Sequence, residues 1–272
     1  MNISNKDLFD RLAREYDSTR GVPPDRALEQ IADGILDIST PTRDTTFLEP
    51  GVGTGRVAVP LARRGFFYTG VDVSWNMMEE LRRKLGKTGT RFSMVQADAA
   101  ALPFRDASFD VVLTAQLLYL IEDWRQALAE VRRVLRPGGL YLFCYEETER
   151  NRAARLLDEQ WGRLLAGYDF EPFWHSSVTN QEVFDTLREQ HADLEDVVAA
   201  EWLHNVPVRQ YLDAYSSIVR PLYPALSDGE FEEAIRNFRT WAEEHLIRDE
   251  AVVSSRTKFM VKVVRNWGGT PP

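Results

Sequence analysis

The sequence has 272 residues, of which 44% are hydrophobic, and a formal net charge of −9, as expected of a globular protein long enough for one large domain. The acidic balance argues against a nucleic-acid substrate, because nucleic-acid binders usually carry a basic face, and the cluster Arg132, Arg133 and Arg136 fits the end of a predicted helix. No apolar run reaches the roughly 18 residues of a membrane span, and no signal peptide is evident. The single Cys144 suits a reducing cytoplasm. We therefore expect a cytoplasmic protein with a small-molecule substrate, no nucleic-acid partner and no membrane association.

Along the chain, apolar residues at helical spacing predict two N-terminal helices, and strands and helices then alternate. Alternation of this kind predicts an α/β fold with a doubly wound, mostly parallel sheet. Ser74 is the expected N-cap of one helix. The expected strands are 45–49, 66–72, 91–96, 109–114, 140–145, 194–206 and 256–264, and the expected helices are 5–17, 27–38, 56–64, 75–85, 124–135, 208–219 and 229–247, with mostly helical structure over 147–190.

No repeat or interdomain linker interrupts the sequence, so residues 1–272 are expected to form a single domain. Its core is predicted to comprise 40–146, 193–206 and 255–265. The remaining helical segments, 1–38, 147–190 and 207–248, are expected to form a cap.

A glycine-rich turn follows the first predicted strand, in the segment Glu49-Pro50-Gly51-Val52-Gly53-Thr54-Gly55. Glycine reaches positive φ without steric cost and leaves room for a ligand against the backbone. The next strand ends in Asp72, 17 residues after Gly55, where an acidic tip can hold ribose hydroxyls. The pattern lacks the G-x-G-x-x-G spacing of a dinucleotide site and the Lys-Ser/Thr pair of a P-loop. A carboxylate beside the turn would repel a pyrophosphate and suit an ammonium or sulfonium ligand.

Together these motifs resemble the class I S-adenosylmethionine-dependent methyltransferases. Four downstream segments continue the resemblance in the same order: Val95–Ala99, Leu102–Phe104, Ser108–Val112 and Leu135–Leu140. The resemblance implies a Rossmann-like, seven-stranded fold with a helical cap. It also implies methyl transfer from S-adenosylmethionine to a small-molecule acceptor by in-line displacement, with S-adenosylhomocysteine as the product.

The residues expected to bind the cofactor lie mostly in these motifs. The resemblance implies that Asp98 and Ala99 lie near the adenine and that Tyr16 belongs to a lid. Gln116 and Leu117 follow the fourth strand, at the sheet edge where α/β proteins bind ligands. The full predicted set is Tyr16, Glu49, Gly51, Gly53, Gly55, Asp72, Val73, Asp98, Ala99, Gln116 and Leu117.

No catalytic residue is evident from the sequence. Tyr119 and His175 are candidates, although packing in an aromatic-rich protein also explains both, and no cluster has metal-ligand spacing. Two other functions stay open: a non-catalytic module that binds S-adenosylmethionine or S-adenosylhomocysteine, and a nicotinamide-dependent oxidoreductase. The sequence leaves the acceptor, the acceptor atom, the pathway and the oligomeric state undetermined.

Overall fold

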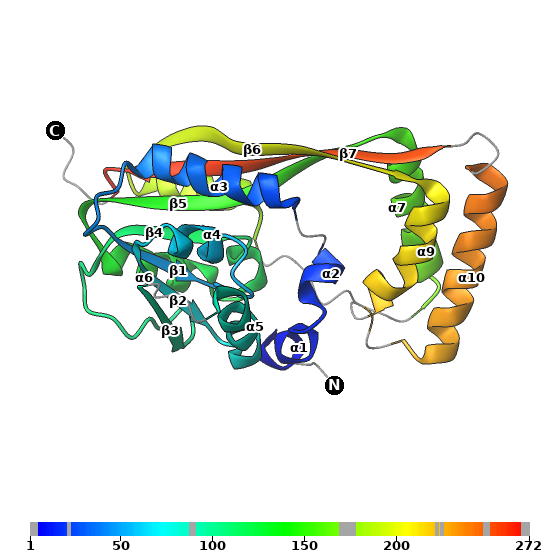
Figure 1. Cartoon of the computed structure of the whole chain (residues 1–272), viewed down its shortest axis with the longest axis horizontal. Coiled ribbons are helices and arrows are strands. Elements are labelled where there is room, and N and C mark those ends of the chain that lie inside the picture. Colours follow the sequence, from blue (N-terminus) through cyan, green and yellow to red (C-terminus); the bar gives the residue numbers. More distant parts are fainter. Residues whose placement is uncertain are drawn as a thin grey trace.

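Seven strands form one mixed sheet in the computed structural model, which describes residues 5–20, 23–86, 91–168, 178–220, 223, 226–246 and 251–267. The strand order is β3-β2-β1-β4-β5-β7-β6. The first five strands are parallel, and β7 is antiparallel to both β5 and β6. This confirms the predicted doubly wound α/β fold (Figure 1). The strands are β1 (Thr46–Pro50), β2 (Phe67–Asp72), β3 (Phe92–Gln96), β4 (Phe109–Ala115), β5 (Leu135–Arg150), β6 (Asp193–Pro207) and β7 (Val252–Arg265).

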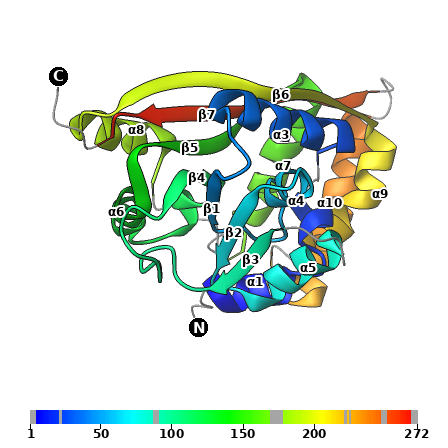
Figure 2. The same ribbon diagram turned by 60° about the vertical axis from the view of Figure 1, so that its left-hand side comes forward.

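Helices cover both faces of the sheet, and each face has its own apolar core (Figure 2). Three helices share one core: α3 (Asp25–Ser39), α4 (Ala58–Arg63) and α5 (Trp75–Leu85). The other core is covered by α6 (Trp124–Val134) and α8 (Asn180–Glu189). Burial on two sides explains why β1 and β4 read as continuous apolar runs in the sequence.

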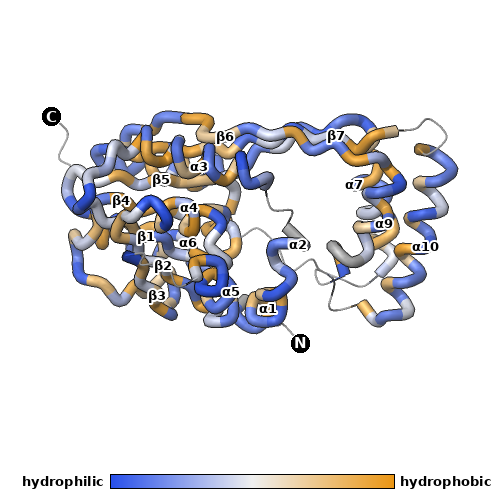
Figure 3. The backbone as a smooth tube through the Cα atoms, in the orientation of Figure 1, coloured by the Kyte–Doolittle hydropathy of each residue, from blue (hydrophilic) through white to orange (hydrophobic). Residues whose placement is uncertain are grey.

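Three long strands carry a separate bundle of helices away from the main sheet. The ends of β5, β6 and β7 extend to α7 (Arg152–Leu165), α9 (Val208–Val219) and α10 (Asp228–His245) (Figure 1). A third apolar core joins these helices around the buried Trp161, and the hydropathy colouring shows apolar residues along them (Figure 3). The Trp161 ring lies 5.3 Å from that of Phe238 and 5.4 Å from that of Tyr215, measured between centroids.

The sequence prediction was wrong about the end of β5, which continues to Arg150 instead of stopping near residue 145. Residues 147–150, expected to be helical, pair with β7. The segment has no apolar alternation, and opposite charges face each other across the two strands instead, as in the pairs Glu147 with Lys258 and Glu149 with Arg256. Such cross-strand pairs stabilise a ladder that the local sequence does not signal.

The first predicted helix, 5–17, is two helices in the structure. Residues 13–15 form a turn between α1 (Asn5–Leu12) and α2 (Tyr16–Arg20). No glycine or proline marks this break, so the apolar spacing suggested a continuous helix. α1 packs against α5, and α2 contacts α9 of the bundle.

Candidate functional site

Two adjoining cavities lie where the turns after β1 and β4 meet. Their volumes are about 540 and 460 Å³. Both are lined by Tyr16, Gly51, Gly53, Ala115 and Gln116, so they meet over the glycine-rich turn. This is the carboxyl edge of a parallel sheet, where open α/β proteins bind ligands.

The three glycines of the turn all adopt positive φ, at +71° for Gly51, +53° for Gly53 and +83° for Gly55. A β-carbon on Gly51 would collide with Leu117, and one on Gly55 would lie 2.8 Å from Leu81 and Val59. Gly53 differs, because its nearest neighbour would be the Met77 side chain at 3.5 Å and the residue lines both cavities. A side chain there would occupy ligand space.

Asp72, at the end of β2, is buried and faces the smaller cavity. Its Oδ2 accepts the N–H of Gly53 at 2.8 Å, and its Oδ1 accepts the N–H of Ser74 at 2.9 Å. Burial raises the pKa of this carboxyl, although the backbone N–H donors oppose the shift. Each oxygen keeps acceptor capacity for a further donor such as a ribose hydroxyl.

Glu49 lies deeper than the sequence suggested. Its side chain is 2% exposed and accepts a short hydrogen bond from the O–H of Tyr68, whose ring stacks between Phe47 and Phe92. Burial raises the pKa of Glu49 to about 8, with the neighbouring Asp72 adding to the shift. The carboxyl lines the larger cavity, and its raised pKa favours the neutral form near pH 7 over the carboxylate expected from the sequence.

The other predicted binding residues gather around the smaller cavity. Its lining includes Val73, Asp98, Ala99 and Leu117. Asp98 is exposed and accepts the N–H of Ala100 at 2.8 Å. Gln116 has a positive φ of +55° and donates its backbone N–H to the backbone carbonyl of Cys144, on β5. This bond fixes the turn after β4 against the neighbouring strand.

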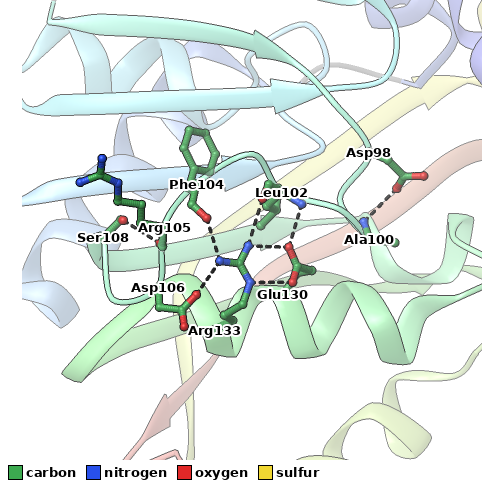
Figure 4. Close-up of polar contacts among 9 residues, drawn as sticks. All are labelled: Asp98, Ala100, Leu102, Phe104, Arg105, Asp106, Ser108, Glu130 and Arg133. Carbon is green, nitrogen blue, oxygen red and sulfur yellow. Dashed lines mark hydrogen bonds and ion pairs between the residues drawn. The ribbon is translucent and has the colours of Figure 1, made fainter.

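Arg133 fastens the loop that follows Asp98 (Figure 4). Its guanidinium donates to the carboxylates of Glu130 and Asp106. It also donates to the carbonyls of Phe104, at 2.7 Å, and Leu102, at 3.0 Å. The basic cluster that the sequence places at a helix end thus contains a clamp for the loop beside the smaller cavity.

Of the two candidate catalytic residues, the structure describes only Tyr119, and it does not line this site. Tyr119 lines neither cavity and packs against the core beneath α6. His175 lies outside the residues that the structure describes. Within the described part of the chain, no group of three or more His, Cys, Asp and Glu side chains is arranged to hold a metal ion, and none of the described helices combines the length and apolarity needed to cross a membrane.

Polar residues outside the predicted binding set surround the turn. Arg56, next to Gly55, forms an ion pair with Glu146 at the wall of the larger cavity. Thr54 and Lys84 both contact Asp17 of α2. Their partners lie far away in the sequence, so no local pattern could have indicated these pairs.

A doubly wound sheet with a glycine cradle and a buried acidic strand tip defines a nucleoside-binding α/β protein. Residues 48–143 match the family model described as a methyltransferase domain. Over these residues the chain therefore carries a methyltransferase domain, which confirms the resemblance to S-adenosylmethionine-dependent methyltransferases seen in the sequence.

Curated relatives that the chain matches are named as methyltransferases. The chain is 35% identical over 153 residues to a fatty-acid O-methyltransferase of Mycolicibacterium smegmatis, a match that covers 56% of this chain and 53% of the relative. The chain spans about half the length of the curated relatives that it matches first.

Two solved structures share the fold at low identity. The [4+2]-cyclase SpnF has a TM-score of 0.58 at 18% identity and covers 96% of this chain, which covers 94% of SpnF. A phosphoethanolamine N-methyltransferase of Haemonchus contortus, solved with S-adenosylhomocysteine, has a TM-score of 0.55 at 18% identity; the match covers 96% of this chain and 61% of that one. One fold thus accompanies several chemistries, so the acceptor depends on the side chains of the site and not on the fold.

Proposed function

We propose that this protein transfers a methyl group from S-adenosylmethionine to a small-molecule acceptor. The observation that carries the proposal is the pairing of Gly53 and Asp72: a residue without a side chain opens the cavity, and a buried carboxylate stands beside it. An adenosyl ligand needs both features, since its ribose supplies hydroxyl donors and its thioether end must pass close to the backbone.

The chain's residues fit the parts of this cofactor. Asp72 would accept the ribose hydroxyls, and the segment with Asp98 and Ala99 would border the adenine, because all three line the smaller cavity. Gly51 and Gly53 would let the remaining part cross toward the larger cavity, which they also line. When bound, the cofactor supplies a methyl group activated by its sulfonium.

The larger cavity is the proposed acceptor site, because it meets the smaller one at the glycine-rich turn. Its wall combines the apolar Leu28, Val59 and Phe259 with the Arg56–Glu146 ion pair. Such a wall suits an acceptor with an apolar body and a polar end. Holding the acceptor in line with the methyl group can lower the barrier by about 7–11 kcal/mol in well-aligned cases.

We also propose that residues 1–272 form a single domain capped by α1, α2 and the bundle of α7, α9 and α10, and that the protein works in the cytoplasm. The sequence analysis places α3 and α8 in the cap, within 1–38 and 147–190, but these two helices pack against the faces of the sheet. The contact between α2 and α9 supports the first proposal. The net charge of −9 and the single, buried Cys144 support an intracellular small-molecule enzyme over a nucleic-acid binder.

Two measurements test the proposed function. Isothermal titration calorimetry should show binding of S-adenosylhomocysteine and S-adenosylmethionine, with no binding of NADH. Mass spectrometry should then detect methylated product from a panel of carboxylic acids, quinols and amines. Cofactor binding without transfer to any acceptor would favour the non-catalytic binding module, and NADH binding would favour the oxidoreductase.

A further inference from the structure

The two N-terminal helices are each fastened to the site by one carboxylate. Asp10 of α1 contacts Ser74, and Asp17 of α2 contacts Thr54 and Lys84 at the wall of the larger cavity. Asp10 accepts the Oγ–H of Ser74 at 2.6 Å. Ser74 also donates its N–H to Asp72. Asp17 accepts the Oγ–H of Thr54, within the glycine-rich turn, at 2.7 Å.

The second attachment is a closed triad of Asp17, Thr54 and Lys84. The Lys84 ammonium lies 2.5 Å from Asp17 Oδ2 and donates to the carbonyl of Thr54 at 2.9 Å. Thr54 is 3% exposed, whereas the side chains of Lys84 and Asp17 are 26% and 36% exposed. Ion pairs at such partly buried positions are screened less than those at the open surface.

The triad includes the direct chain neighbour of Tyr16. Tyr16 directly precedes Asp17 and lines both cavities, and its ring contacts Phe9 edge to face at 6.0 Å. Phe9 and Lys6 of α1 also line the smaller cavity. A ligand in that cavity would therefore be covered by side chains that the two carboxylates hold in place.

We propose that Asp17 and Lys84 are positioning residues that retain the bound cofactor by holding α2 to the glycine-rich turn. The inference rests on the proposed function, since it assumes an adenosyl ligand in the smaller cavity. Displacement of α2, which would carry Tyr16 away from the smaller cavity, requires the contacts of Asp17 with Thr54 and Lys84 to break. Because α2 also contacts α9, the same triad joins the cofactor turn to the helical bundle.

The test measures the dissociation rate of S-adenosylhomocysteine from the 272-residue chain by stopped-flow displacement. Asp17→Asn and Lys84→Met should each release the ligand about tenfold faster, as expected for the loss of one charge-assisted contact. The double variant should release it no faster than the quicker single variant, because either change opens the same triad. Asp17→Glu should recover most of the wild-type rate.

Asp185→Asn is the matched control, because it removes an exposed carboxylate that pairs with Arg188 on α8; its release rate should equal that of the wild type. Melting temperatures of all variants separate a local effect from unfolding, and Lys84→Met keeps the test valid if Asp17→Asn folds poorly. Wild-type release rates in both single variants would overturn the positioning role while leaving the proposed function intact. A wild-type chain that does not bind S-adenosylhomocysteine would overturn both.

Discussion

The backbone N–H of Gly53 donates to Oδ2 of Asp72 at 2.8 Å and so ties the turn after β1 to the tip of β2. The bond fixes the two features that define the site relative to each other. The bond also holds the carboxylate against the glycine-rich turn. Glycine adopts this backbone conformation without strain, since φ at Gly53 is +53°.

The first prediction concerns Gly53→Ala. The methyl group should project into the shared part of both cavities and reduce the affinity for S-adenosylhomocysteine at least about tenfold, or about 1.4 kcal/mol. Gly65→Ala is the control, because Gly65 also has a positive φ, +88°, but no atom lies within 4 Å of its added β-carbon. Both variants should lose about 1–2 kcal/mol of stability from backbone strain, and calorimetry should show lost affinity in Gly53→Ala alone. Equal affinities would remove Gly53 from the ligand site.

The second prediction concerns Asp72→Ala. Loss of the carboxylate should weaken S-adenosylhomocysteine binding by roughly 1–3 kcal/mol, because charge-assisted bonds to the ribose disappear. An analogue lacking both ribose hydroxyls should bind the variant and the wild type with similar affinity, which distinguishes ribose contact from general damage to the turn. Asp213→Ala, at an exposed ion pair with Arg239, should bind both ligands normally. If the variant discriminates between the two ligands as the wild type does, Asp72 does not contact the ribose.

The core of this fold could be predicted from sequence because its signals are local. β1 and β2 are short apolar runs, and the glycines between them mark a turn whose conformation they alone adopt easily. Ser74 caps α5 by accepting the N–H of Met77 at 3.2 Å, as its position suggested.

What sequence could not predict depends on partners far along the chain. The polar end of β5 is a strand only because β7 lies beside it, and the triad at Asp17 exists only after α2 reaches Thr54. The ionisation state of Glu49 is a further case. A glutamate beside glycines suggests a charge, but its burial against Tyr68 results from the parallel pairing of β1 with β2 in the sheet.

The third prediction concerns Arg133→Lys. An ammonium cannot reproduce the planar fork that reaches Glu130, Asp106 and two loop carbonyls. We expect a loss of about 1–2 kcal/mol in unfolding free energy, measured in urea, since several charge-assisted bonds are replaced by fewer. Arg132→Lys changes an exposed neighbour on the same helix and should have no measurable effect. Equal stability of the two variants would show that Arg133 does not clamp the loop.

The fourth prediction is a pH dependence of stability that arises from Glu49. Its pKa is about 8 in the folded chain against an ordinary value of 4.5, so between these values the folded state retains a proton that the unfolded chain has lost. Stability from this group is therefore fully present below about pH 4.5 and decreases as the pH rises toward about 8. The decrease is at most roughly 1.4 kcal/mol per pH unit.

Glu49→Gln keeps an acceptor for the Tyr68 O–H but cannot titrate. Its unfolding free energy, measured in urea at pH 5.5 and 7.5, should decrease less between the two pH values than that of the wild type, while Glu79→Gln, at an exposed pair with Arg82, should follow the wild type. Asp72 also has a raised pKa and adds to the shift of Glu49, so the wild-type decrease in excess of that of Glu49→Gln reports Glu49 together with its interaction with Asp72. A Glu49→Gln variant with the full wild-type pH dependence would mean that Glu49 is ionised in the folded chain, as the sequence predicts.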